Sequence, residues 1–267
     1  MTMPLHALAR HDFAHFAFGP QIDDTRPVES AIVTRLRSFV RLGVDEVDAL
    51  ERLAGQSRIF QSEKILIHEG TTINSVCLIV KGLAYRYKML TGGRRQILGY
   101  LIPGDVCDIQ FAISNRPDYS VALIGSTSIT RISTSSLDQL ITQYPKIGRA
   151  LSLAAIMDSA ILREWLLGVG QRDALQKLSH FFCEMSVRMD SVGGVSDEGS
   201  FDLPVNQATL ADSLGMTTTH VNRTLQRLRH DGLIELRNRK LSILDSEGLA
   251  TLAGFDGTYL RMKLMAC

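Results

Sequence analysis

The chain has 267 residues, of which 45% are hydrophobic and 21% are charged, a composition typical of a globular protein long enough for two domains. Its formal net charge of +1 excludes a uniformly basic nucleic-acid-binding chain, so any basic surface must be local. No apolar stretch reaches membrane-spanning length, and the start lacks the apolar core of a signal peptide, so we expect a cytoplasmic protein without membrane contacts. The four cysteines lack the close spacing of an iron–sulfur or zinc site, and we expect reduced, mostly buried thiols.

The first 55 residues predict a tail followed by two short helices. Residues 1–28 are irregular, and we interpret them as an N-terminal tail. His11 and His15 lie four residues apart, but two histidines without a third ligand make a poor metal site, so no metal is expected. Residues 29–55 carry apolar positions at helical spacing, and Gly55 ends the second helical pattern.

Residues 56–134 consist of short apolar or β-branched runs. Turn signals such as Gly92-Gly93 and Pro103-Gly104-Asp105 separate these runs. Short strands at this spacing predict a small sandwich, barrel or jelly roll. Together with the leading helices, they define an expected first domain at residues 29–143.

Residues 144–168 predict one long helix with apolar residues around most of its circumference. One side can pack on the β domain, and a second copy of the chain is the economical partner for the other side, so we expect a homodimer. A helix buried within one monomer is the alternative. We expect an aspartate at Leu151 or Ile161 to separate the dimer. Gly168 and Gly170 suggest a hinge after the helix.

Residues 169–267 predict a further domain that ends in a helix, a tight turn, a second helix and a hairpin. Gly215 suits the turn, and Thr217 suits the cap of the second helix. Val221, Leu225 and Leu228 recur at helical spacing and are expected to face the core. This order of elements is typical of a winged helix-turn-helix.

The second helix carries a polar face opposite its apolar one. We expect base contacts from the residues at its N-terminal end, which are Thr218, Thr219, Asn222 and Arg223. We expect phosphate contacts from the neighbouring cationic residues His220, Arg227, Arg237, Arg239 and Lys240. Residues 217–240 hold six Lys or Arg and two acidic residues, a local charge of +4. The predicted partner is therefore double-stranded DNA.

These motifs resemble those of the Crp/Fnr family of bacterial transcription regulators over roughly residues 30–250. The most specific matches are "LIPGDVCD" and "LADSLGMTTTHVNRTLQRLRHDGLI", and "REWLLGVGQRDALQKLSHFFCEM" resembles the subgroup common in alphaproteobacteria. The resemblance implies an α+β fold with an N-terminal β roll like that of cyclic-nucleotide-binding domains, a long dimerisation helix and a C-terminal winged helix-turn-helix. It also implies a homodimer that reads a two-fold symmetric operator and recruits or blocks RNA polymerase. Thr219 stands where many members carry a glutamate, so the operator need not be the common family sequence.

The resemblance is weaker in the sensor. Cyclic-nucleotide-binding members carry a Gly-Glu pair after the Pro-Gly-Asp turn, and then an Arg followed by Ser or Thr that holds the cyclic phosphate. Here the residues at or near these positions, which form our candidate ligand pocket, are Asp108, Gln110, Arg116, Tyr119 and Ser120. The first 76 residues contain no cysteine, unlike the oxygen-sensing branch. We expect no cofactor and no gating by cyclic AMP through the usual phosphate clamp. The chain would then take a different, less charged effector or be active without one.

Other functions remain as alternatives. No nucleophile elbow, P-loop or dinucleotide fingerprint is present, so we expect no enzyme activity. The chain could instead act through protein contacts alone, or respond to a cyclic nucleotide through a clamp relocated to Arg116. A redox switch at Cys107 or Cys183 is a further possibility, although Asp105 and Asp108 beside Cys107 disfavour a reactive thiolate.

Overall fold

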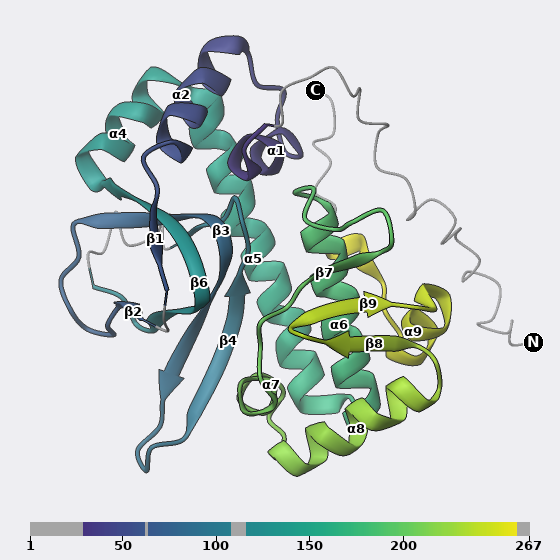
Figure 1. The fold of residues 1–267 in the computed structure, drawn as a ribbon. Helices are drawn as coiled ribbons and strands as arrows, with labels where there is room; N and C mark the ends of the chain where they lie inside the picture. The colour runs from purple at the N-terminus through teal and green to yellow at the C-terminus, as the bar shows by residue number, and fades with distance from the viewer. Residues whose placement is uncertain (1–28, 62–63, 108–115, 261–267) are drawn as a thin grey trace, which may run out of the picture.

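The computed structural model describes residues 29–61, 64–107 and 116–260, which form a β roll, a long helix and a smaller helical domain (Figure 1). Helices α1 (Ala31–Arg37) and α2 (Val44–Ala54) precede the roll, as expected from the sequence. The histidines of the predicted tail lie outside the described residues. The α+β architecture predicted from the sequence is confirmed.

The roll is an antiparallel sheet in the order β1-β6-β3-β4, with β2 paired to β6 and β5 paired to β3. Its strands are β1 (Arg58–Phe60), β2 (Ile65–Ile67), β3 (Ser75–Met89), β4 (Arg95–Leu101), β5 (Val106–Cys107) and β6 (Ser120–Ser133). The long strands β3 and β6 shift register near Gly82, which has a φ of +84°. A Cβ at Gly82 would stand 2.6 Å from the carbonyl oxygen of Ser126, so this close crossing requires glycine.

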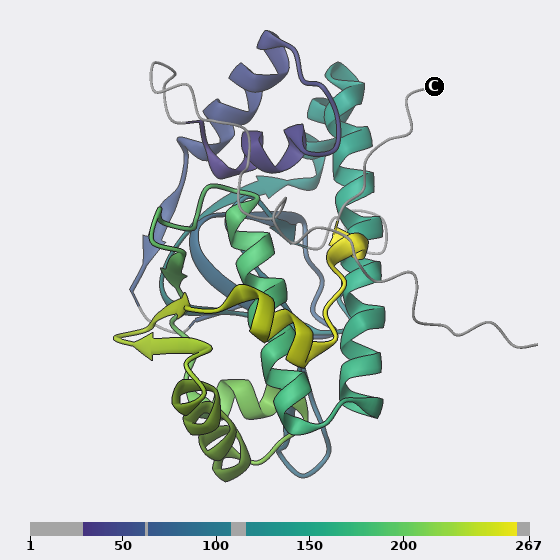
Figure 2. The same cartoon turned by 90° about the vertical axis from the view of Figure 1, so that its right-hand side faces the viewer.

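Helix α5 (Pro145–Gln171) follows α4 (Thr134–Gln143) and connects the roll to the helical domain. Pro145 occupies its first turn, where a missing N–H is tolerated. Its 27 residues span about 40 Å, and the helix runs along the length of the molecule (Figure 2). The helix continues through Gly168 and Gly170, so the hinge predicted there is wrong.

Arg172 explains why the helix does not end at these glycines. Its backbone N–H donates to the carbonyl of Gly168, and its guanidinium donates to both the carbonyl and the carboxylate of Glu164. The first bond satisfies the carbonyl of Gly168, one of the four that the last turn of the helix leaves unpaired, and the other two hold the Arg172 side chain against the turn that carries Glu164. The sequence contains these partners, but spacing alone did not reveal them.

The helical domain is built around α6. Its elements are α6 (Ala174–Asp190), β7 (Ser200–Asp202), α7 (Gln207–Leu214), α8 (Thr218–His230), β8 (Ile234–Arg237), β9 (Lys240–Ile243), α9 (Ser246–Ala253) and the 3-10 helix η2 (Gly257–Leu260). Helix α6 packs against both α8 and α9, and the three strands form a sheet in the order β7-β9-β8. Among the described residues, no helix has the length and apolar character needed to cross a membrane.

The helical domain packs against the roll. One apolar cluster joins Tyr85 and Tyr100 of the roll to Phe181 and Phe182 of α6. The ring of Tyr100 lies 5.4 Å from that of Phe181 and 6.0 Å from that of Trp165 on α5, centroid to centroid. The roll, the long helix and α6 therefore meet around one buried tyrosine.

Candidate nucleic-acid interface

Helices α7 and α8 meet at a sharp turn whose geometry the sequence explains. Gly215 adopts a φ of +63°, the left-handed conformation that glycine tolerates best. Thr217 then caps α8, because its hydroxyl accepts a hydrogen bond from the backbone N–H of His220 at 3.2 Å. Val221, Leu225 and Leu228 are buried, as the spacing predicted, and they fix α8 against the domain.

The opposite face of α8 is polar and open. A surface hollow at its N-terminal half is lined by Gln207, Thr218, Thr219, Asn222, Arg223 and Gln226. The structure thus brings together the four residues predicted to contact bases, here called the recognition face (Thr218, Thr219, Asn222 and Arg223). It adds Gln207 from α7 and Gln226, which the sequence analysis missed. Gln226 lies one helical turn after Asn222, so the same spacing rule could have found it.

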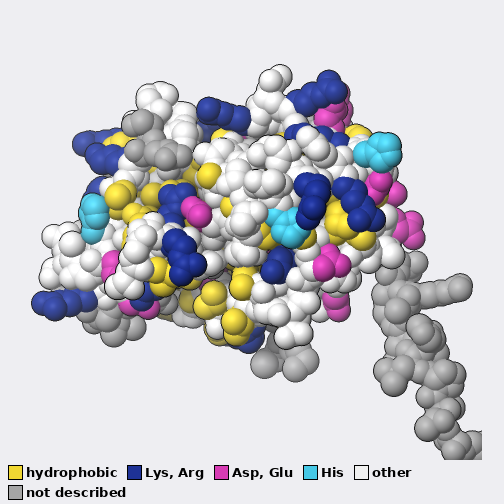
Figure 3. Space-filling model, turned by 90° about the horizontal axis from the view of Figure 1, so that it is seen from below, with side chains coloured by type: hydrophobic (Ala, Val, Ile, Leu, Met, Phe, Trp, Pro, Cys, Tyr) yellow, Lys and Arg dark blue, Asp and Glu magenta, His cyan; other side chains and the backbone are white. Residues whose placement is uncertain are grey.

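The cationic residues predicted to contact phosphates are spread around this face. His220 and Arg227 are exposed on α8, and Arg227 lies 3.6 Å from the carboxylate of Asp231. Arg237 is also exposed and pairs with Glu235 at 2.8 Å. Seen from below, Lys and Arg side chains stand out across the side of the molecule that carries α8 (Figure 3).

The hairpin of β8 and β9 forms the wing. Asn238 and Arg239 at its tip both have positive φ, which a tight two-residue hairpin turn requires. Arg239 and Lys240 are exposed, but the guanidinium of Arg239 leans toward the roll, 4.0 Å from the position of a Cβ on Gly125. In this arrangement Arg239 borders the roll, while Lys240 starts strand β9.

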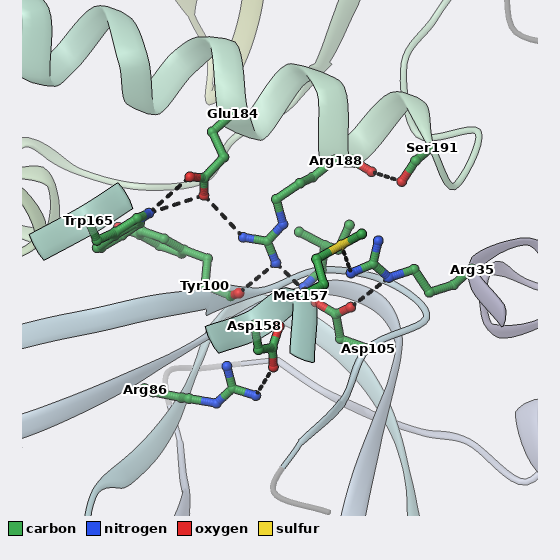
Figure 4. A network of polar contacts seen from close by, with 11 residues as sticks. Arg35, Arg86, Tyr100, Asp105, Met157, Asp158, Trp165, Glu184, Arg188 and Ser191 are labelled. Atoms are coloured by element: carbon green, nitrogen blue, oxygen red, sulfur yellow. Dashed lines mark hydrogen bonds and ion pairs between the residues drawn. The ribbon is translucent and has the colours of Figure 1, made fainter. Parts of the chain in front are cut away.

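A buried network of charges lies where the helical domain meets the roll (Figure 4). The carboxylate of Asp105, in the turn after β4, accepts from Arg35 of α1 at 3.2 Å and from Arg188 of α6 at 3.1 Å. Arg188 also donates to the carbonyl of Tyr100 at 2.9 Å and lies 3.5 Å from Glu184. These four charged side chains are at most 7% exposed, so water contributes little to their solvation.

Glu184 is the innermost member of the network. Its carboxylate accepts from the indole N–H of Trp165 at 3.1 Å and from the hydroxyl of Tyr259 at 2.9 Å. Burial raises the pKa of Glu184 above its ordinary value, although Arg188 and these two donors work in the opposite direction. The network therefore connects α5, α6 and η2 with the roll.

Comparison with known proteins identifies the family. The family model of the cyclic nucleotide-binding domain matches residues 57–144, and that of the Crp-like helix-turn-helix domain matches residues 176–252, together more than half of the chain. The nitrogen fixation regulation protein FixK of Bradyrhizobium diazoefficiens is 28% identical over 212 residues, 79% of this chain and 87% of that protein. The transcriptional activatory protein AadR of Rhodopseudomonas palustris is 29% identical over 212 residues, with the same shares covered.

The chain belongs to the Crp/Fnr family of transcription regulators. The structure of FixK2 from Bradyrhizobium japonicum has the same fold, with a TM-score of 0.66 and 23% identity over 75% of this chain and 98% of that chain. As a Crp/Fnr member, the chain is a sequence-specific DNA-binding regulator rather than an enzyme. Members of this family bind DNA and typically act as dimers.

The long helix α5 carries an apolar face that the described residues of the chain leave exposed. Its exposed residues, with their exposed fractions, are Ile156 (53%), Leu162 (52%), Leu166 (74%), Leu167 (47%) and Val169 (43%). Leu151 and Ile161, where the sequence analysis placed the dimer-breaking changes, are only 3% and 4% exposed. Those two positions face the core of the monomer, so the expectation that a charge there would act on the dimer is wrong.

The sensor residues of this Crp/Fnr chain are only partly brought together. Tyr119 and Ser120 are buried in the roll, and the hydroxyl of Ser120 accepts from the N–H of Glu69 at 3.0 Å. Arg116 is exposed, and Asp108 and Gln110 lie outside the described residues. Arg86 of β3, which residue spacing did not indicate, also lies here, with its guanidinium 5.8 Å from the centroid of the Tyr119 ring. Arg86 also donates to the carboxylate of Asp158 on α5 at 2.9 Å.

The described cysteines are buried and form no disulfide. Cys77 and Cys107 face each other across β3 and β5 and are 1% and 0% exposed. Cys183 is buried on α6, and burial raises the pKa of its thiol to about 12. A thiol with such a raised pKa is a poor nucleophile at neutral pH, so Cys183 is not suited to a redox switch.

Proposed function

We propose that this Crp/Fnr regulator binds a two-fold symmetric operator as a homodimer, with α8 of each protomer in the major groove and no cyclic nucleotide in the usual clamp. In this proposal, residues 29–143 form the sensor, residues 144–168 form the dimer helix, and residues 169–267, which begin with the last turn of α5, form the DNA-binding domain. The names of relatives such as FnrA and AadR describe transcriptional activators, which supports a role in transcription. In the proposal, this regulator acts in the cytoplasm and helps or blocks RNA polymerase.

The exposed recognition face of α8 is the observation that carries the proposal. Its N-terminal residues are held outward by a buried apolar face, a capped start and a glycine turn. Arg223 can donate to the two acceptors of guanine, Asn222 can pair with adenine, and the methyl group of a threonine can contact thymine. Thr219 offers no charged acceptor for cytosine, which favours an operator that differs from the common family sequence.

The apolar face of α5 supports the dimer. One side of the helix carries apolar residues separated by seven, four and three positions, which are Ala155, Leu162, Leu166 and Val169. A second copy related by a two-fold axis would cover this face with an identical one. Two recognition helices would then read two half-sites about one helical turn of DNA apart.

The interior of the roll supports the absence of the usual clamp. A buried cyclic phosphate needs a paired cation, because an unpaired charge in a dry site costs several kcal/mol. Tyr119, at the position of the family's arginine, offers only a neutral hydroxyl. The neighbouring cation, Arg86, already pairs with Asp158 of α5. An ion pair of the chain itself therefore connects the roll to the long helix at this point.

Two experiments test the proposal. Electrophoretic shift of genomic fragments should show specific complexes of the wild type that Arg223→Ala abolishes or weakens, and a wild type that shifts no fragment would favour action through protein contacts alone. Calorimetric titration with cyclic AMP and cyclic GMP should show no micromolar binding. Micromolar binding that disappears in Arg86→Gln would place a relocated clamp on β3, and binding that disappears in Arg116→Ala would place it at the rim of the roll.

A further inference from the structure

Two ion pairs attach the helical domain to the roll at the two ends of β4. At one end, Arg95 donates to the carboxylate of Asp212 on α7 at 2.8 Å. Just beyond the other end, Asp105 accepts from Arg188 of α6 at 3.1 Å. Between them, the hydroxyl of Tyr100 lies 2.9 Å from that of Ser213. A rigid body held at two separated points can rotate only about the line that joins them.

The two attachments differ in their surroundings. Arg95 and Asp212 are 27% and 32% exposed, so water screens their attraction, and exposed pairs of this kind contribute little. Arg188 and Asp105 are 2% and 7% exposed, and Arg188 also donates to the Tyr100 carbonyl. A guanidinium that reaches two acceptors in a dry site is held in one direction as well as at one distance. The buried pair is therefore the contact that defines orientation.

The charges around this contact are balanced on each side of the junction. Asp105 has a second cation, Arg35 of α1, on the roll side of the junction, and Arg188 has a second anion, Glu184, on α6. If the two domains part, each side keeps a neutral pair and no single charge is left without a partner. The Asp105–Arg188 pair thus joins two parts in which each buried charge has another partner on its own side. This is the property of a docking contact.

From this geometry we propose that Arg188 is a positioning residue for DNA recognition. By docking on Asp105, it fixes the direction of α6 relative to the roll and α5. Helix α8 packs on α6, so the direction of α6 sets where the recognition face of each protomer points. In a dimer joined through α5, this sets the distance and the rotation between the two recognition faces. The inference rests on the proposed function, since it requires a dimer that reads two half-sites.

The spacing between half-sites is the readout that separates positioning from plain stability. One added or removed base pair shifts a half-site by about 3.4 Å and rotates it by about 35° around the DNA axis. A dimer with fixed recognition helices cannot follow such a change, whereas a dimer with loosened domains can. Loss of Arg188 should therefore weaken the preference for one spacing, in addition to any effect on stability.

The experiment compares Arg188→Gln with Arg35→Gln, which removes the other cation of the same carboxylate but lies on the roll side. Binding is measured to the selected operator, to operators with one base pair more or less between half-sites, and to a single half-site. The wild type and Arg35→Gln should lose on the order of 30-fold or more at the wrong spacing. Arg188→Gln should lose at most about 5-fold at the wrong spacing while single half-site binding stays unchanged.

A second variant protects the test against misfolding of Arg188→Gln. In the double variant Arg188→Met with Glu184→Gln, both charges that α6 contributes to the buried network are removed together, so no charge is buried without a partner. It should show the same relaxed spacing preference. Wild-type spacing preference in a folded variant of either kind, with only a lowered melting temperature, would overturn the positioning role. A wild type that shows no spacing preference would instead refute the proposed dimer on two half-sites, and the inference with it.

Discussion

Arg223 is the exposed arginine of the recognition face, and its planar fork matches the two acceptors of guanine. We expect Arg223→Ala to weaken operator binding by about 1–3 kcal/mol and to relax the preference at one base of each half-site. Arg227→Ala, a matched change one turn later on α8, should weaken operator and random DNA alike and reduce the salt dependence. Titrations of both DNAs at two salt concentrations measure these effects. Equal losses of Arg223→Ala on the two DNAs would assign Arg223 to the DNA backbone.

His180 makes the stability of the chain depend on pH. Burial, together with Arg172, lowers the pKa of His180 to about 4. Glu164 lies 3.6 Å from the imidazole but is already paired with Arg172 at 2.7 Å, so it does not reverse this shift. The rings of Phe255 and Tyr259 pack against the imidazole, with centroids 5.1 Å and 6.1 Å from its own.

The sign follows from the protons bound by each state. Because the folded pKa lies below the unfolded value of about 6.5, unfolding takes up a proton as the pH falls from about 6.5 to 4, and the stability contributed by neutral His180 is lost in this window. We expect a loss of about 2 kcal/mol between pH 7 and pH 4.5 that is missing in His180→Gln. Urea unfolding at several pH values measures it. The wild type and His180→Gln both contain Glu184, whose raised pKa changes the stability in the opposite direction as the pH falls. Parallel pH profiles of the two proteins would therefore contradict the assignment of the loss to His180.

At the scale of a single element, we predict that helix α5 holds the dimer together. Leu162→Asp and Leu166→Asp each place two buried carboxylates across the proposed two-fold contact, where unpaired charge is costly. We expect the dimer dissociation constant to rise by at least about 100-fold, without a change in fold. Size exclusion with light scattering measures the oligomeric state. Ile161→Ala, at a position 4% exposed in the monomer, should lower the melting temperature while the protein stays dimeric. A wild type that is monomeric at micromolar concentration would contradict the dimer.

The same helix shows how far the sequence predicts an element. Its apolar spacing predicted a long helix with burial on more than one side, because helical periodicity is a local property. The spacing could not decide which apolar side faces the roll, and it placed Leu151 and Ile161 on the wrong one. The partner of a helix face depends on the packing of distant segments. The turn and cap at Gly215 and Thr217, by contrast, are local features, and both were predicted correctly.

The side-chain contacts that couple the domains join distant parts of the chain, and residue spacing could not predict them. Asp105 is 70 residues from Arg35 and 83 residues from Arg188 in the sequence. Only the fold brings these three side chains together, although the Pro-Gly-Asp turn did mark Asp105 as part of the roll. Arg86 and Asp158, 72 residues apart, meet for the same reason. The residues predicted to contact bases lie together on one short helix, so local spacing could group them, while the contacts that would orient that helix are non-local.

Selection of bound sequences from a random DNA pool, without any added nucleotide, is the most direct test of the central claim. The claim is that a homodimer of this chain presents two copies of the recognition face to a two-fold symmetric operator. We expect the pool to converge on an inverted repeat with half-site centres about 10–10.5 base pairs, or a multiple of that distance, apart. Arg223→Ala should lose the preference at one base of each half-site. A pool that does not converge, that converges on a single unpaired half-site, or that converges only when cyclic AMP is added would contradict the account.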